Sequence, residues 1–185
     1  FASCSPSPFF LRLAKLPRAI RRHLETAKSA KARKKGLSTA AMAIELLVVA
    51  PMRLGNLSQL HLDRNFIAVG DKTYLVVPKE DVKNTVNLEY DLPPETVALL
   101  AWYVGNHRKA DPQNRYLFAG EGLTQKSANT LRQQIMGSVK AFTGHTVNPH
   151  LFRAIAGTII LRDVPGAYEL VRQVLGHRNI ATTTR

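Results

Sequence analysis

The chain has 185 residues, enough for one domain with a single core, which argues against a multidomain organisation. It carries 26 Lys and Arg against 13 Asp and Glu, a formal net charge of +13, so the expected partner is a polyanion, nucleic acid before a membrane surface. The lone Cys4 excludes an internal disulfide, no Cys/His cluster has zinc-site spacing, and no segment approaches the roughly 18 consecutive apolar residues of a membrane-spanning helix. We therefore expect an intracellular protein that binds no metal.

The first 36 residues are strongly basic. The opening ten residues have neither an initiating Met nor the order of a secretory signal, so we expect them to begin a fragment. From Pro17 the pattern predicts an amphipathic helix, whose apolar face holds Ile20, Leu24 and Ala27. This helix is expected to continue through residues 31–35 to Gly36, a residue typical of a C-cap. We assign residues 1–36 to a basic N-terminal extension that includes this first helix and could be mobile.

Residues 37–185 are expected to form the main domain. Ser38 or Thr39 can cap a second helix that ends at about Ala50, and its apolar residues 44–49 should enter the core. Three segments rich in β-branched and aromatic residues follow, and they predict a small antiparallel sheet with strands at 65–69, 73–77 and 86–90.

The remainder of the chain has the pattern of helices. Pro93 and Pro94 start a helix over 95–107, and residues 116–118 form an extended connector. Further helices are expected at about 126–142, 150–161 and 167–175, with breaks at Gly144, Pro149 and Pro165-Gly166. The predicted fold class is mainly α with a small antiparallel β-sheet, an α+β arrangement.

Arg53 follows the second predicted helix, in the string Pro51-Met-Arg-Leu-Gly-Asn-Leu57. An arginine in a loop is ordinarily a solvent-facing charge. Here Leu57, Leu60 and Leu62 would anchor the following turn and hold Arg53 against the core, as a phosphate ligand must be held. Because a guanidinium fork suits two oxygens of one phosphate, Arg53 is a candidate for an anion site.

A second cationic motif lies near the carboxyl end of the chain. His150-Leu-Phe-Arg153 places a histidine and an arginine at i and i+3, so both would project from one face near a helix start. Taken alone, this string is common by chance, and a histidine after Pro149 could be a cap or surface residue. One predicted helix later comes Leu175-Gly-His177, where the ordinary interpretation is a partly buried histidine after a C-cap glycine.

These three motifs, in this order, resemble the catalytic domain of tyrosine recombinases, the phage integrase family. The resemblance runs from about residue 37 to 185, and it implies the DNA breaking-rejoining fold of that domain. It also implies that Arg53, His150, Arg153 and His177 surround one phosphate of double-stranded DNA. Members usually carry an acidic residue three positions after the first arginine, where Asn56 stands here. A salt-bridge partner for Arg53 is thereby removed.

The resemblance further implies a general-acid lysine on the turn of a β-hairpin. The candidates are Lys79 and Lys83, in Pro78-Lys-Glu-Asp-Val-Lys-Asn84. Counting back from residues 92–100, where members have a Pro-Leu stretch and then a helix, favours Lys83. Outside the family, a hairpin lysine is usually a solvated edge residue.

By this resemblance, a tyrosine hydroxyl attacks the scissile phosphate and leaves a 3′-phosphotyrosyl link, while the freed 5′-hydroxyl receives a proton from Lys83. Neither ATP nor a metal or other cofactor is implied, because the cationic side chains supply the positive field. The tyrosine is expected directly after Arg185, so the 185-residue fragment should be inactive. The basic residues of 15–35 should follow the DNA backbone.

Members usually carry an amino-terminal core-binding domain, which we expect to be absent from these 185 residues. They assemble as tetramers of recombinase protomers on DNA, and the isolated fragment should be monomeric. The implied setting is a bacterial cytoplasm, with a phage or other mobile genetic element as the source. Three alternatives remain open: a type IB topoisomerase, a non-enzymatic DNA-binding module that retains the fold, and a basic RNA-binding domain. The last is disfavoured because the strands show no pattern of exposed aromatic residues for base stacking.

Overall fold

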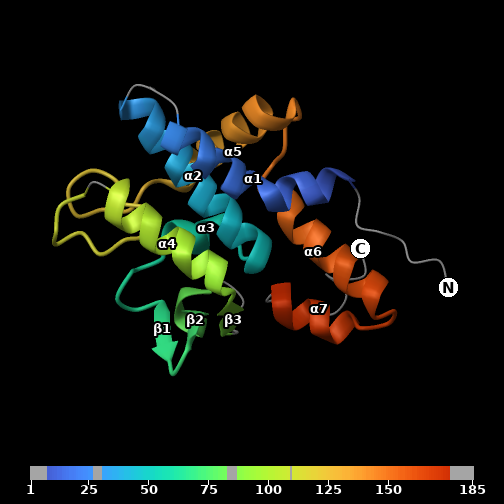
Figure 1. The fold of residues 1–185 in the computed structure, drawn as a ribbon. Coiled ribbons are helices and arrows are strands. Elements are labelled where there is room, and N and C mark those ends of the chain that lie inside the picture. Colours follow the sequence, from blue (N-terminus) through green and yellow to red (C-terminus); the bar gives the residue numbers. More distant parts are fainter. Residues whose placement is uncertain (1–7, 27–30, 83–86, 109, 176–185) are drawn as a thin grey trace.

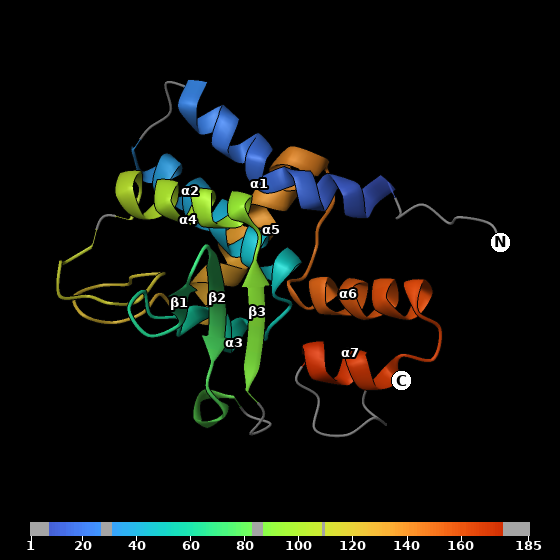
Figure 2. The same cartoon turned by 60° about the horizontal axis from the view of Figure 1, so that its bottom comes forward.

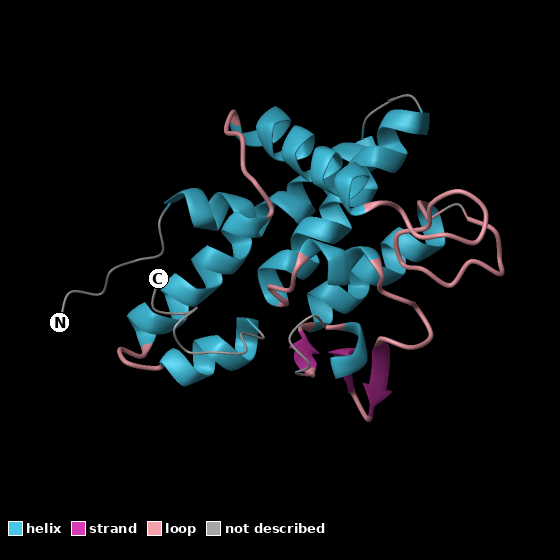
Figure 3. Cartoon of the chain, turned by 180° about the vertical axis from the view of Figure 1, so that it is seen from behind, coloured by secondary structure: helices cyan, strands magenta, loops and turns pink. Residues whose placement is uncertain are grey.

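Helices form most of the computed structural model, and a small sheet lies at one edge (Figures 1 and 3). The structure describes residues 8–26, 31–82, 87–108 and 110–175, with the backbone alone for 31–35. Its elements are α1 (Pro8–Thr26), α2 (Lys31–Val49), α3 (Leu54–Ser58), β1 (Phe66–Val69), β2 (Lys72–Val77), η1 (Lys79–Asp81), β3 (Leu88–Leu92), α4 (Pro94–Asn106), α5 (Ala128–Thr143), α6 (His150–Asp163) and α7 (Tyr168–Leu175). This arrangement confirms the predicted fold class.

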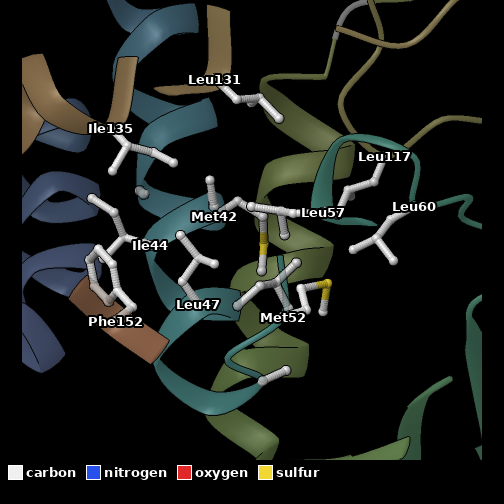
Figure 4. Packing of buried hydrophobic residues seen from close by; sticks show 14 of the residues in the cluster. Met42, Ile44, Leu47, Met52, Leu57, Leu60, Leu117, Leu131, Ile135 and Phe152 are labelled. Carbon is white, nitrogen blue, oxygen red and sulfur yellow. The ribbon is translucent and has the colours of Figure 1, made fainter. Parts of the chain in front are cut away.

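Helix α2 is the centre of the core. It packs against α1, α4, α5 and α6, which is why its residues from 38 to 47 are all buried. Figure 4 shows Met42, Ile44 and Leu47 of α2 among side chains of α3, α5 and α6. The prediction that residues 44–49 enter the core is confirmed for 44–47, while Val48 and Val49 are half-buried.

Three predicted helix boundaries near the amino end are wrong. Helix α1 begins at Pro8, so Pro17 is inside it, and Figure 2 shows α1 bending near its middle, as an interior proline causes by removing a backbone hydrogen bond. Gly36 is inside α2 and caps nothing, and Ser38 and Thr39 are buried rather than capping. A helical glycine costs about 1 kcal/mol. Burial of the residues that follow it offsets this cost.

The amino-terminal helix is packed on the body of the protein. Leu13, Leu16, Ile20 and Leu24 are buried against α2, so residues 8–26 do not form a loose extension. Ala27, the third member of the predicted apolar face, lies outside the described residues. The division at residue 36 stays a prediction.

The sheet is antiparallel in the order β1-β2-β3. Strand β3 ends two residues later than predicted, and its Leu88, Tyr90 and Leu92 are buried while Glu89 and Asp91 are exposed. This alternation places Tyr90 on the face of the sheet that meets the helices.

A buried polar contact joins α2 to α4. Glu45 is 6% exposed, and its carboxylate accepts a hydrogen bond from the Thr96 hydroxyl at 2.6 Å.

Helix α5 ends at Gly144, whose φ of 76° is the left-handed conformation expected of a glycine C-cap.

Helices α6 and α7 lie side by side, with β3 as the strand nearest α7 (Figures 1 and 2). Gly157 permits this close approach, because a Cβ atom there would lie 3.3 Å from Val171 Cγ1. Among the described residues, none of the helices has the length and apolar character required to cross a membrane.

Candidate active site

Arg53 is held at the junction between the central helix and α3. Its backbone is extended, with φ −69° and ψ 147°, and it serves as the N-cap residue of α3. Pro51 and Met52 before it are buried, as are Leu57 and Leu60 after it, whereas Leu62 is half-buried. The half-buried Arg53 side chain therefore extends from a backbone that is fixed on both sides.

Asn56 occupies the position at which an acidic residue was expected from the resemblance. It is 9% exposed, and its Nδ2 makes no hydrogen bond within the described structure. A buried amide without a partner is unusual, because its desolvation is not compensated.

Arg153 is buried on α6 and binds two distant segments of backbone. It is 8% exposed; one guanidinium nitrogen donates to the carbonyl of Pro51 and another to the carbonyl of Leu175, each at 2.6 Å. The bond to Pro51 joins positions 102 residues apart and places Arg153 beside the segment that carries Arg53. An arginine has five N–H donors, so donors remain for a further acceptor.

The two arginines affect each other electrostatically. The pKa of Arg153 is lowered to about 10, first by burial and second by the positive charge of Arg53, while Tyr90 raises it. Arg153 is thus still protonated at neutral pH, and two like charges face one region. A phosphate bound there would relieve their repulsion.

His150 is the first residue of α6, one turn before Arg153. Its side chain is exposed, and its backbone N–H donates to Asn148 Oδ1 at 3.1 Å. The buried Arg153 and the exposed His150 therefore differ in environment although they share one helix.

Two predicted site residues, Lys83 and His177, lie outside the described residues. The described flanks of Lys83 are anchored: Val82 is buried, and the Lys79 backbone N–H donates to Asn87 Oδ1 at 2.8 Å. Arg64, before β1, and Asp81, in η1, form an ion pair at 2.5 Å beside the same turn. Lys79, the alternative general acid, is exposed in η1.

Tyr90 adjoins this site, and the sequence analysis did not single it out. It is 8% exposed, and its hydroxyl donates to the carbonyl of Val174 at 2.8 Å. Burial raises the pKa of Tyr90 to about 12, and the nearby charge of Arg153 opposes that rise. The alternation of β3 could have shown that Tyr90 faces inward. It could not have shown which carbonyl it meets.

We find no candidate metal site among the residues that the structure describes. No three His, Cys, Asp or Glu side chains lie together there in an arrangement that could hold a metal ion.

Comparisons with known proteins support the family that the motifs predict. The family model described as phage integrase family matches residues 16–185, and no curated protein sequence matches the chain. The chain resembles XerH site-specific recombinase bound to difH substrate, with 18% identity and a TM-score of 0.71 over 92% of this chain and 47% of that one. It also resembles XerA recombinase, with 20% identity and a TM-score of 0.65 over 94% and 57% of the two chains.

A lambda integrase dimer bound to a COC′ core site is similar too, with 16% identity and a TM-score of 0.55 over 91% of this chain and 57% of that one. At these identities the likeness concerns the fold. The chain spans about half the length of XerH. Since the family model covers nearly all of it, the chain belongs to the phage integrase family.

Proposed function

We propose that this chain is the catalytic domain of a site-specific DNA recombinase that cuts and rejoins strands through a 3′-phosphotyrosyl intermediate. The observation that supports this most is the pairing of Arg53 with Arg153, two guanidinium groups that share an electrostatic environment although they come from distant parts of the chain. Placing two like charges together lowers the stability of the fold, and binding of an anionic group of the substrate would offset this loss.

Each side chain has a role in the proposed reaction. Arg53 and Arg153 bind the non-bridging phosphate oxygens, and His150 and His177 donate hydrogen bonds to the same phosphate or assist the nucleophile. A tyrosine hydroxyl gives its proton to the histidine that assists it and forms an O–P bond, while the bond from phosphorus to the 5′-oxygen breaks. Lys83 gives its proton to that leaving oxygen. Attack by a 5′-hydroxyl on the phosphotyrosine reverses these steps, so no external energy source is needed.

The partners proposed are double-stranded DNA and further recombinase protomers, with tetramers on DNA as the assembly and bacterial cytoplasm as the setting. XerH was solved bound to difH substrate, and lambda integrase was solved as a dimer bound to a COC′ core site. The net charge of +13 fits a polyanion. Figures 1 and 2 show α1 on the side of α2 and α4 that is opposite the sheet. The expected DNA contacts of its basic residues are therefore a prediction separate from the phosphate site.

Trapping of covalent complexes tests the proposal. Cells that express the complete gene product are lysed in denaturant, protein-linked DNA is recovered, and nuclease and protease digestion precedes mass spectrometry. A tyrosine–nucleotide adduct is expected, and sequencing of the linked DNA identifies the site. Arg53→Ala should abolish the adduct, whereas Arg132→Ala, at an exposed position of α5, should not.

The alternatives predict other results. DNA binding without any adduct in the wild type would contradict the enzyme and favour a binding module. Relaxation of supercoiled DNA that carries a single site would favour a topoisomerase. Loss of the adduct in Lys83→Ala but not in Lys79→Ala would support Lys83 as the general acid, and the reverse pattern would assign that role to Lys79.

A further inference from the structure

Two side chains from outside α7 bind its last carbonyls. Tyr90 of β3 donates to the carbonyl of Val174, and Arg153 of α6 donates to the carbonyl of Leu175, the next residue. The last four carbonyls of a helix have no partner within it, and such side chains supply one. Tyr90 and Arg153 therefore cap the same helix end together.

Helix α7 has eight residues and packs mainly against α6, and Val174 of its last turn packs against the core as well. The two caps add hydrogen bonds to this packing. Val171 and Leu175 are its buried residues, and both lie close to Gly157 of α6. The bond from Tyr90 instead joins α7 to the sheet, across 84 residues of sequence.

The two caps differ in their relation to the substrate. Arg153 is a proposed phosphate ligand, and its bonds to Pro51 and Leu175 leave N–H donors for the phosphate. Tyr90 has one hydroxyl proton, which is already committed to Val174, and a pKa of about 12 keeps it protonated across the physiological range. Tyr90 therefore has no donor for the substrate, and its proposed effect is on the position of the helix end.

We propose that Tyr90 is a positioning residue: through Val174 it holds the end of α7 against β3, and thereby holds the neighbouring Leu175 carbonyl that orients Arg153 toward the phosphate. This inference rests on the proposed function. One phenol would then fix the carbonyl that orients a proposed phosphate ligand. A displacement of about 1 Å at a reacting centre can cost about 100-fold in rate.

The test compares Tyr90→Phe with Tyr74→Phe, which removes the same hydroxyl from the neighbouring strand β2. The complete gene product, with a duplex that carries the site recovered from covalent complexes, is assayed for single-turnover cleavage. We expect Tyr90→Phe to slow cleavage about 10- to 100-fold. The Kd for DNA should stay within about twofold of wild type, because no phosphate contact is removed. Tyr74→Phe should cleave as the wild type does.

A sulfur substitution in the DNA separates positioning from general acid catalysis. A 5′-bridging phosphorothiolate has a thiolate leaving group that needs no proton, so it should restore cleavage by Lys83→Ala. It should not restore Tyr90→Phe, since the defect proposed lies at the phosphate ligand Arg153 and not at the leaving group. Rescue of Tyr90→Phe by sulfur, or cleavage by Tyr90→Phe at the wild-type rate, would overturn the inference.

A second variant tests the inference if Tyr90→Phe does not fold. Replacing Leu175 by its α-hydroxy acid turns the Val174 carbonyl into an ester carbonyl, a weaker acceptor, and leaves Tyr90 in place. Slower cleavage with unchanged DNA affinity is expected, and wild-type cleavage would refute the role. An inactive wild type would instead defeat the proposed function itself, so the two failures are distinguishable.

Discussion

Replacing Arg53 by Gln should stabilise the DNA-free protein, although Arg53 is a proposed phosphate ligand. Arg153 is buried and charged, and the positive charge of Arg53 is the second largest cause of its lowered pKa. Removing that charge leaves the hydrogen bonds of Arg153 to Pro51 and Leu175 in place. The substitution therefore relieves a repulsion without exposing a buried donor.

The pKa of Arg153 sets the magnitude. The lowering of the Arg153 pKa to about 10 corresponds to a few kcal/mol, at about 1.4 kcal/mol per pKa unit. Burial is the largest cause, and Arg53 is half-exposed to screening water, so we expect Arg53→Gln to raise the free energy of unfolding by about 1 kcal/mol. A base with a lowered pKa is destabilised when charged. The penalty is thus fully present below about pH 10 and disappears as the pH rises from there through the ordinary pKa of arginine.

Urea denaturation at pH 7 and low salt measures the effect. With a slope of about 2 kcal/mol per molar, a gain of about 1 kcal/mol moves the midpoint up by about 0.5 M. Arg132→Gln is the matched control, because it lowers the net charge equally at an exposed site on another helix. Guanidinium chloride, being a salt, should shrink the difference between the two variants.

Two results would refute this reasoning. Equal midpoints for Arg53→Gln and Arg132→Gln would show that only net charge matters, and a lower midpoint for Arg53→Gln would show that Arg53 stabilises the fold. At equal ionic strength, sulfate should stabilise the wild type more than Arg53→Gln, because the anion binds between the paired arginines.

Three further outcomes are expected. In anisotropy titrations of a labelled duplex, Arg53→Gln should reduce the slope of log K against log salt by about 0.9, whereas an unchanged slope would mean that Arg53 contacts no phosphate. Thr96→Val should lower the free energy of unfolding in urea by about 1 to 3 kcal/mol, because Glu45 loses its buried donor; a neutral result would argue against that contact. Gly144→Ala should lower the melting temperature by a few degrees, since its φ of 76° strains a residue with a Cβ by about 1 kcal/mol, and a rise would exclude this strain.

Local sequence patterns were sufficient where a short segment carries its own signal. Pro94, Gly144 and Pro149 mark real helix limits, and the β-branched segments form the three strands. The patterns failed at Pro17 and Gly36, which both lie inside helices. There the packing of α1 and α2 outweighed residue preferences of a few kcal/mol at most.

Local sequence patterns were likewise sufficient for one part of the candidate site and insufficient for another. Motif order made Arg53 and Arg153 candidates because their neighbours in sequence are distinctive, and their catalytic roles stay a prediction. No local sequence pattern indicated that the Asn56 amide would make no hydrogen bond within the described structure, or that Tyr90 would donate one to Val174.

The amino-acid sequence by itself determined the residue types, the order of helices and strands, and the membership of the family. Only the tertiary structure decided that Arg153 is buried beside Arg53 and that it shares the end of α7 with Tyr90. The physical reason is the separation along the sequence over which each kind of interaction acts. Periodicity and capping act over a few residues, whereas these contacts join positions 84 and 102 residues apart, which become neighbours only when the core packs.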